Sequence, residues 1–253
     1  MEQTPQKSRF QFKEVPAALF RPRTAFARLG QGAGSTWLTP MLILTLTLII
    51  RILVGGYLQG VAAATGQAPL PDAWQWWTPE MQQQYMQAQS LTQGPVFLYV
   101  IPISLGLAGL WAGWGIVSGL LHLTSTLLGG RGSMKSALDV VAWGSLPFAV
   151  RDIIRVAYML VVQHSINSPG LSGFVTITDA TSTVFLSQML AAVDIFWLWY
   201  LVLVGIGISE RDSLSNRKAF GGAILVLLVV LLAQAGLGVL TSKMGGLLVT
   251  RPF

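Results

Sequence analysis

The chain has 253 residues, of which 53% are hydrophobic and only 10% are charged, and its formal net charge is +6. A soluble domain usually carries about 25% charged residues, so this composition excludes an ordinary soluble protein and predicts an integral membrane protein. The basic residues lie at the ends of apolar segments, which is typical of membrane topology signals and argues against nucleic acid as a partner.

The lead-in, residues 1–36, is predicted to be a cytoplasmic amphipathic segment. Pro22 suits the first turn of a short helix, in which Ala25, Phe26 and Leu29 would share one side, with arginines around them. Such a helix is suited to the surface of an anionic leaflet. It can also be an ordered lead-in that only fixes topology. We expect both roles together and no binding specificity.

Five apolar segments each reach the roughly 20 residues that a helix needs to cross a bilayer. The predicted fold is therefore all-α: a five-span polytopic membrane domain over 37–240, followed by a short tail, 241–253. The predicted spans are 37–58, 95–128, 137–163, 184–209 and 219–240. The second span is longer than the bilayer needs, so we expect it to tilt, to break near Pro102 or to extend into the cytoplasm. The third should kink near Pro147, because proline lacks an N–H group.

The distribution of Lys and Arg predicts the orientation of these spans. Residues 1–36 carry six such residues, the 129–136 turn carries two and the 210–218 turn carries three, whereas residues 60–94 and 164–183 carry none. Cytoplasmic segments are the ones enriched in Lys and Arg. The N-terminus is therefore predicted to be cytoplasmic and the C-terminal tail extracytoplasmic, as five spans require.

The loop of residues 60–94 combines a tryptophan cluster with a helix-start signal. Thr78 is suited to the N-cap and Pro79 to the first position of a helix, and Trp74, Trp76 and Trp77 precede them. Tryptophan is enriched at the headgroup level, so the loop is expected along the outer membrane surface. A contact with the external domain of a partner is the alternative.

The 129–136 turn, GGRGSMKS, is predicted to reverse the chain sharply. Its characteristic residues are Gly129, Gly130, Arg131, Gly132 and Lys135, and glycine reaches positive φ angles without steric cost. The turn resembles a phosphate-binding loop only superficially, because Met134 stands where that pattern needs a glycine before the lysine. We therefore exclude nucleotide binding there.

Small residues in the second span predict close helix packing. Gly109 and Gly113 are four residues apart, as are Gly115 and Gly119, and such pairs let the backbones of two membrane helices approach. This pattern is common in apolar helices, so it predicts packing and nothing about function.

Polar residues in four spans are predicted to lie at nearly one depth. Arg51, Arg151, Asp194 and Gln234 are each 14 or 15 residues from the cytoplasmic end of their span, or roughly 21–22 Å at the helical rise of 1.5 Å per residue. Arg155 would lie one turn higher and Asp152 beside Arg151; these six residues form the predicted polar layer.

An unpaired arginine at mid-membrane costs about 2.5–3.5 kcal/mol. We therefore expect Arg51, Arg151 or Arg155 to face inward and to pair with Asp194 or Asp152; Asp152 and Arg155 can also pair along their own helix. An ionic clasp between helices, or a contact with a partner protein, is the preferred interpretation. A cavity that admits an ion, an anionic lipid or a substrate is the second.

Three stretches resemble the bacterial branch of the Yip family, five-span membrane proteins named for relatives that interact with Ypt/Rab GTPases. They are LFRPRTAFARL, LLGGRGSMKSALDVVAWGSLPF and LVLVGIGISERDSLSNRKAFGGAILV. The features shared are the Gly129–Gly130 turn, Pro147 and the turn into Ala219 and Phe220. The arginines of the polar layer are not family features. The resemblance brings no catalytic residues and implies a membrane adaptor; some bacterial members look like accessory subunits of MacB-type ABC exporters.

The expected function is therefore a non-enzymatic accessory or assembly subunit of a membrane complex in the bacterial cytoplasmic membrane. The resemblance implies an ABC permease, an ATPase and a periplasmic adaptor as partners, besides membrane lipids. A small transporter or channel that uses the polar layer is the alternative, and a membrane enzyme is disfavoured because no catalytic pattern is visible. No cofactor or metal is expected, since the chain has no cysteine and only His122 and His164.

Overall fold

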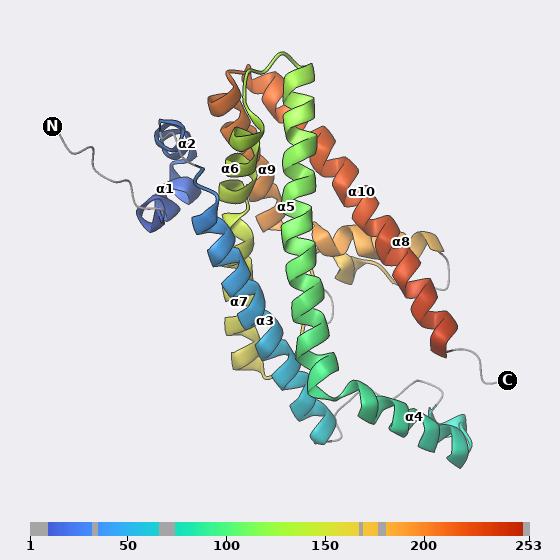
Figure 1. The fold of residues 1–253 in the computed structure, drawn as a ribbon. Helices are drawn as coiled ribbons and strands as arrows, with labels where there is room; N and C mark the ends of the chain where they lie inside the picture. Colours follow the sequence, from blue (N-terminus) through green and yellow to red (C-terminus); the bar gives the residue numbers. More distant parts are fainter. Residues whose placement is uncertain (1–9, 32–34, 66–73, 167–168, 177–180, 250–253) are drawn as a thin grey trace. The chain divides into compact units, whose positions relative to one another are not determined.

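The structure is a computed structural model of the chain, and it describes residues 10–31, 35–65, 74–166, 169–176 and 181–249 (Figure 1). The fold is all-helical, as the sequence predicts. The α-helices are α1 (Val15–Phe20), α2 (Pro22–Gly30), α3 (Leu38–Ala64), α4 (Pro79–Thr92), α5 (Ile101–Leu127), α6 (Met134–Gly144), α7 (Leu146–Val162), α8 (Thr181–Ala192), α9 (Ile195–Asp212) and α10 (Asn216–Val249). The short turns are η1 (Phe12–Glu14), η2 (Trp74–Trp76), η3 (Val96–Val100) and η4 (Ser172–Phe174).

The chain divides into two compact units. Unit 1 comprises Met1–Leu44, Ala112–Val150 and Asn167–Phe253, and unit 2 comprises Thr45–Trp111 and Arg151–Ile166. Helices α3, α5 and α7 therefore contribute residues to both units.

Three helical segments are long and apolar enough to cross a membrane: Leu38–Ala64, Val96–Leu127 and Asn216–Ser242. Helices α8 and α9 together make a fourth candidate, although the chain bends by 63° between them. Among the described residues the candidate spans thus number three or four. The predicted span 137–163 falls on α6 and α7, which are interrupted at Ser145, so five spans and the orientation of the termini stay predictions.

The interruption expected near Pro147 is found two residues earlier. Helix α6 ends at Gly144 and α7 begins at Leu146. Pro147 lies in the first turn of α7, where a missing N–H group is tolerated.

The predicted span 184–209 is not one continuous helix. Asp194 adopts an extended conformation and caps α9, where its carboxylate accepts a hydrogen bond of 2.9 Å from the backbone N–H of Trp197. A carboxylate at a helix N-terminus satisfies a backbone donor that has no helical partner. The prediction that Asp194 lies within a regular span is therefore wrong in this respect: the residue marks the junction of two helices.

The boundaries predicted for the last two spans also differ from those of the helices in the structure. Helix α9 continues to Asp212 and α10 begins at Asn216, so the predicted 210–218 turn contracts to three residues. Ser213 in this turn has a φ of 55°, a left-handed conformation that ends a helix. Helix α10 extends to Val249, so the tail predicted for 241–253 is helical over most of its length.

The lead-in is an integral part of unit 1. Helix α2 begins at Pro22, as predicted, and Ala25, Phe26 and Leu29 are fully buried in the core of this unit. A Cβ atom on Gly207 of α9 would lie 3.0 Å from Cζ of Phe26, so the glycine makes room for the ring. The prediction of a leaflet-binding apolar face is therefore wrong, because protein covers that face.

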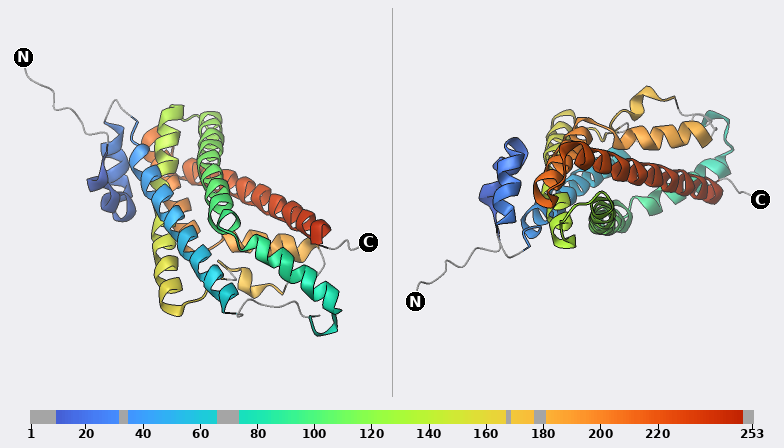
Figure 2. Two further views of the ribbon diagram at one scale, coloured as in Figure 1. Left: turned by 60° about the horizontal axis from the view of Figure 1, so that its bottom comes forward. Right: turned by 90° about the horizontal axis from the view of Figure 1, so that it is seen from above.

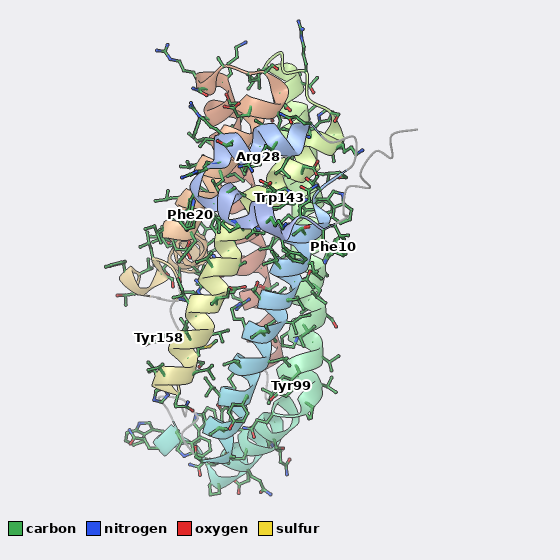
Figure 3. The ribbon with its side chains drawn as sticks, turned by 90° about the vertical axis from the view of Figure 1, so that its left-hand side faces the viewer. Phe10, Phe20, Arg28, Tyr99, Trp143 and Tyr158 are labelled. Carbon is green, nitrogen blue, oxygen red and sulfur yellow. The ribbon has the colours of Figure 1, made fainter. Side chains whose placement is uncertain are left out.

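The core of unit 1 surrounds α6, whose residues are nearly all buried. Trp143 is fully buried, and its Nε1 donates a hydrogen bond of 3.0 Å to the hydroxyl of Thr36 (Figure 3). Tyr200 of α9 packs on Phe148, with ring centroids 5.0 Å apart. Helices α8 and α10 also lie side by side in this unit (Figure 2).

Unit 2 contains a close approach between α3 and the start of the second predicted span, at a glycine that the sequence analysis did not single out. Because Pro102 has no N–H group, the carbonyl of Leu98 loses its usual helical donor, and the chain forms the π-helical turn η3 just before α5. A Cβ atom on Gly56 of α3 would lie 2.8 Å from that carbonyl oxygen and 2.6 Å from the ring of Tyr99. The predicted break near Pro102 is therefore a local π-turn.

The tryptophan-rich loop of unit 2 forms a small aromatic cluster. Trp74, Trp77 and Tyr85 lie in mutual contact, with ring centroids 5.5–5.7 Å apart. Helix α4 begins at Pro79, as predicted, and the hydroxyl of Thr78 accepts a hydrogen bond from the backbone N–H of Met81. Together these contacts pack the tryptophan cluster against the first turns of α4.

Candidate functional site

A buried carboxylate joins three helices of unit 1. Asp212, the last residue of α9, is 1% exposed. Its side chain accepts hydrogen bonds from the hydroxyl groups of Ser125 in α5 and Ser136 in α6, the latter at 3.2 Å. Its backbone carbonyl accepts a hydrogen bond of 3.1 Å from the N–H of Arg131. A buried carboxylate needs hydrogen-bond donors, and the two serine hydroxyl groups supply them, whereas the N–H of Arg131 fixes the backbone of Asp212.

The glycines of the 129–136 turn are required by this arrangement. Gly129 has a φ of +90°, so it makes the reversal. A Cβ atom on Gly132 would overlap the carboxylate of Asp212, and one on Gly130 would lie 2.9 Å from the carbonyl oxygen of Ser125. The predicted reversal is therefore confirmed at Gly129, and Gly130 and Gly132 allow the turn to pack on the buried acid.

A second buried acid lies beside the first. Asp139 of α6 is 3% exposed, and its Oδ1 accepts hydrogen bonds from the N–H of Thr36 at 2.7 Å and the hydroxyl of Ser35 at 3.2 Å. Arg211 places Nη2 3.7 Å from Asp139 Oδ2 and donates from Nε to Ser136 Oγ at 3.3 Å. Arginine suits this position because its planar group can bond to several acceptors at once.

We call this network the polar core of unit 1, defined by Ser125, Ser136, Asp139, Arg211 and Asp212. It connects the segment before α3 with α5, α6 and α9. Sequence analysis missed it, because Arg211 and Asp212 were assigned to a solvated turn. The signal was present in ALDVVAWG, where an aspartate stands within an apolar run and is costly unless paired.

Unit 2 contains an ion pair of the kind predicted for the polar layer. Arg51 of α3 places Nε 3.1 Å from Oδ1 of Asp152 in α7, and Arg151 Nε lies 3.9 Å from the same oxygen. Asp152 is buried, whereas Arg51, Arg151 and Arg155 are half-buried. The expected contact between Arg51 and Asp152 is thus present.

The other members of the predicted polar layer belong to unit 1. Asp194 caps α9, and Gln234 is exposed on α10. A single layer at one depth stays a prediction.

The small residues of α5 do not pack as expected. A Cβ atom on Gly109, Gly113, Gly115 or Gly119 would meet no neighbouring atom of the described residues within 4 Å. Among the described residues, the prediction of close packing at these four glycines is therefore wrong. Close approach occurs instead at other glycines, among them Gly56, Gly132 and Gly207.

A cavity of about 600 Å³ lies between the N-terminal segment and α2. Its walls include the stacked rings of Phe10 and Phe12, with centroids 5.9 Å apart, and an ion pair of 3.3 Å between Glu14 Oε1 and Arg28 Nη1. The labelled Phe10 and Arg28 in Figure 3 mark its two sides. The cavity is thus aromatic at one side and ionic at the other.

Across the described residues, no group of three or more His, Asp and Glu side chains is arranged to hold a metal ion. Comparison with curated proteins and with solved structures gave no match. The Yip1 domain family does match, over residues 17–237. The match begins in α1 and ends in α10, so it includes residues 17–36 of the lead-in, the polar core and the 129–136 turn. The chain therefore belongs to the Yip1 domain family, and its long apolar helices make it a membrane protein of that family.

Proposed function

We propose that this chain is a non-enzymatic accessory or assembly subunit of a membrane complex, and that the complex is a MacB-type ABC exporter in the bacterial cytoplasmic membrane. In this proposal an ABC permease, an ATPase and a periplasmic adaptor are its partners. The ATPase and the permease carry out transport, and this chain stabilises their assembly. Membership of the Yip1 domain family supports an integral membrane role.

The polar core is the observation that supports a structural role most directly. Asp139 and Asp212 are buried, Arg211 is 14% exposed, and each of the three makes contacts within the chain. Buried ion pairs fix the arrangement of the groups that they join, because separating them leaves a charge uncompensated. The charges therefore serve to hold helices together, which suits a scaffold for other subunits.

The open glycine face of α5 supports a helical partner. Gly115 and Gly119 are one helical turn apart, and no atom of the residues that the structure describes occupies the space that their side chains would fill. Small residues at this spacing allow a second membrane helix to approach closely. In the assembly that we propose, a helix of the permease lies against them.

Affinity purification of the full chain from native membranes in a mild detergent tests this proposal. We expect the permease and the ATPase to be recovered with the tagged chain in a fixed ratio. Replacement of Gly115 and Gly119 by leucine should reduce their recovery at least tenfold without lowering the thermal stability of the isolated chain. Recovery of the wild-type chain alone, in each detergent and lipid condition, would contradict the proposal.

A small transporter or channel is the second candidate, and the contact between Arg51 and Asp152 favours it. Charged residues within membrane helices commonly mark ion or substrate pathways. This candidate expects charge-selective flux in liposomes that contain only this chain, and loss of that flux in Arg51→Gln. Absence of flux from liposomes with correctly folded protein would eliminate it.

A further inference from the structure

Two turns of unit 1 present positive charge on adjacent segments. The turn between α5 and α6 carries Arg131, Lys135 lies at the start of α6, and Arg217 lies at the start of α10. All three side chains are exposed. We call these three residues the basic platform; both turns lie at the upper end of α5 and α10 in Figure 1.

The backbone of the basic platform is held in place. The N–H of Arg131 donates to the carbonyl of Asp212, and Nζ of Lys218 donates to the carbonyl of Leu128 at 2.9 Å. The hydroxyl of Ser209 donates to the carbonyl of Leu214 at 2.9 Å and to Oδ1 of Asn216 at 2.8 Å. The buried carboxylate below the turns is already engaged by two serines. The basic platform is therefore mounted on a fixed backbone, and its three side chains are exposed to an external partner.

The platform lies next to the ends of two candidate membrane spans. One span ends at Leu127 and another begins at Asn216. Leu127 is 78% exposed and Met134 is 39% exposed, and both lie within a few residues of Arg131. Exposed apolar side chains beside basic ones are typical of the headgroup level, where alkyl groups enter the acyl region and cations reach the phosphates.

We propose that the basic platform is a binding site for anionic phospholipid headgroups, with phosphatidylglycerol as the representative ligand. Guanidinium groups bind phosphate oxygens through two parallel hydrogen bonds, and Arg131 and Arg217 can supply one such group each. Lys135 adds a third charge. The exposed leucine and methionine favour a lipid over an acidic soluble protein, because such a protein would not cover apolar side chains at the membrane boundary.

The test uses the full chain, purified in a neutral detergent without any partner subunit. Its thermal unfolding is followed while phosphatidylglycerol, phosphatidylcholine or inorganic phosphate is added. A ligand that binds only the folded state raises the unfolding temperature in proportion to its occupancy. We expect phosphatidylglycerol to stabilise the chain much more than the other two ligands do, and the effect to weaken at high salt.

The decisive variant combines Arg131→Gln, Lys135→Gln and Arg217→Gln. Each cation near a membrane surface contributes roughly a five-fold increase in affinity for anionic lipid, so the triple variant should bind phosphatidylglycerol about 100-fold more weakly. Lys218 is left unchanged, because it bonds to the end of α5.

A control variant removes the same charge from the lead-in through Lys13→Gln, Arg21→Gln and Arg23→Gln, and should keep the full response. A response retained by the platform variant, or equal stabilisation by phosphatidylcholine or by inorganic phosphate, would overturn the proposal. If the platform variant does not fold, Arg217→Gln alone is compared by native mass spectrometry, where it should retain fewer phosphatidylglycerol molecules than the control. An equal number retained would also overturn it. The inference needs only the chain itself, so failure of the proposed exporter role would leave this result unaffected.

Discussion

The carboxylate of Asp212 lies so close to the Cα atom of Gly132 that no side chain fits between them. Because Asp212 is fully buried and also accepts hydrogen bonds from Ser125 and Ser136, it cannot move aside without losing these partners. The turn and the end of α9 therefore depend on each other.

The first prediction concerns that contact. Gly132→Ala should destabilise the chain by about 2 kcal/mol, since overpacking of a rigid site usually costs 1–3 kcal/mol. Thermal unfolding in detergent measures the change. Gly115→Ala is the control, because a Cβ atom there meets open space; in a helix interior it should be neutral or slightly stabilising. Equal stability of the two variants would argue against a tight contact at Gly132.

The second prediction concerns the pair formed by Arg211 and Asp139. Removal of Arg211 leaves the buried carboxylate of Asp139 without a cation, and removal of Asp139 leaves the guanidinium of Arg211, which is only 14% exposed, without an anion. Arg211→Ala and Asp139→Ala should therefore each cost about 3–5 kcal/mol. The double variant should cost less than the sum of the two single variants, with a coupling energy of about 1–3 kcal/mol. A double-mutant cycle on unfolding free energies measures this. Additive losses would mean that the 3.7 Å contact contributes no interaction energy.

The third prediction compares the ion pair between α3 and α7 with one in the lead-in. Arg51 and Asp152 should show a coupling energy above 1 kcal/mol, because the acid is buried and breaking a buried pair is costly. Arg28 and Glu14 form the control pair; Arg28 is half-exposed, and exposed pairs typically contribute about 0.2–1 kcal/mol. Two matched double-mutant cycles provide the comparison. Equal coupling energies would show that burial of Asp152 adds nothing.

The fourth prediction concerns two phenylalanines of the lead-in. Phe26 is 2% exposed, whereas Phe20 is 74% exposed. Phe26→Ala should therefore cost about 3–5 kcal/mol of unfolding free energy, and Phe20→Ala should change it by less than about 0.5 kcal/mol. Chemical unfolding in detergent measures both. A tolerated Phe26→Ala would restore the interpretation of α2 as a helix that binds the leaflet.

Local features of this fold were predictable from the sequence. Pro22, Pro79 and Gly129 each act on their immediate neighbours, through a fixed φ angle, a missing N–H group or access to positive φ. The starts of α2 and α4 and the reversal before α6 therefore follow from a few adjacent residues. The all-helical membrane architecture follows from the length of the apolar segments.

The polar core could not be predicted in the same way. Asp212 bonds to Ser125 and Ser136, which lie 87 and 76 residues away in the chain. No local pattern shows which serines would meet a distant acid. The contact between Arg51 and Asp152 was expected only because a lone charge in a membrane helix needs a partner. That argument left several possible pairings of arginine and aspartate.

Glycine spacing was the least informative signal. The four residues Gly109, Gly113, Gly115 and Gly119 have the spacing of a packing motif and yet meet no neighbour among the described residues. Gly132 and Gly207 have no such spacing, but a Cβ atom on Gly132 would overlap the carboxylate of Asp212, and one on Gly207 would lie 2.7 Å from a neighbouring side chain. The need for a glycine is set by what packs on it, and that is a tertiary property.

The burial of Phe26 against Gly207 also constrains how the protein is made. Helix α2 leaves the ribosome before α9, which covers it and begins about 165 residues later. At typical synthesis rates this interval lasts roughly 10–30 s. During that time α9 cannot yet pack on the aromatic side of α2. A nascent chain that stalls before α9 would therefore expose an apolar helix that cellular quality control can recognise.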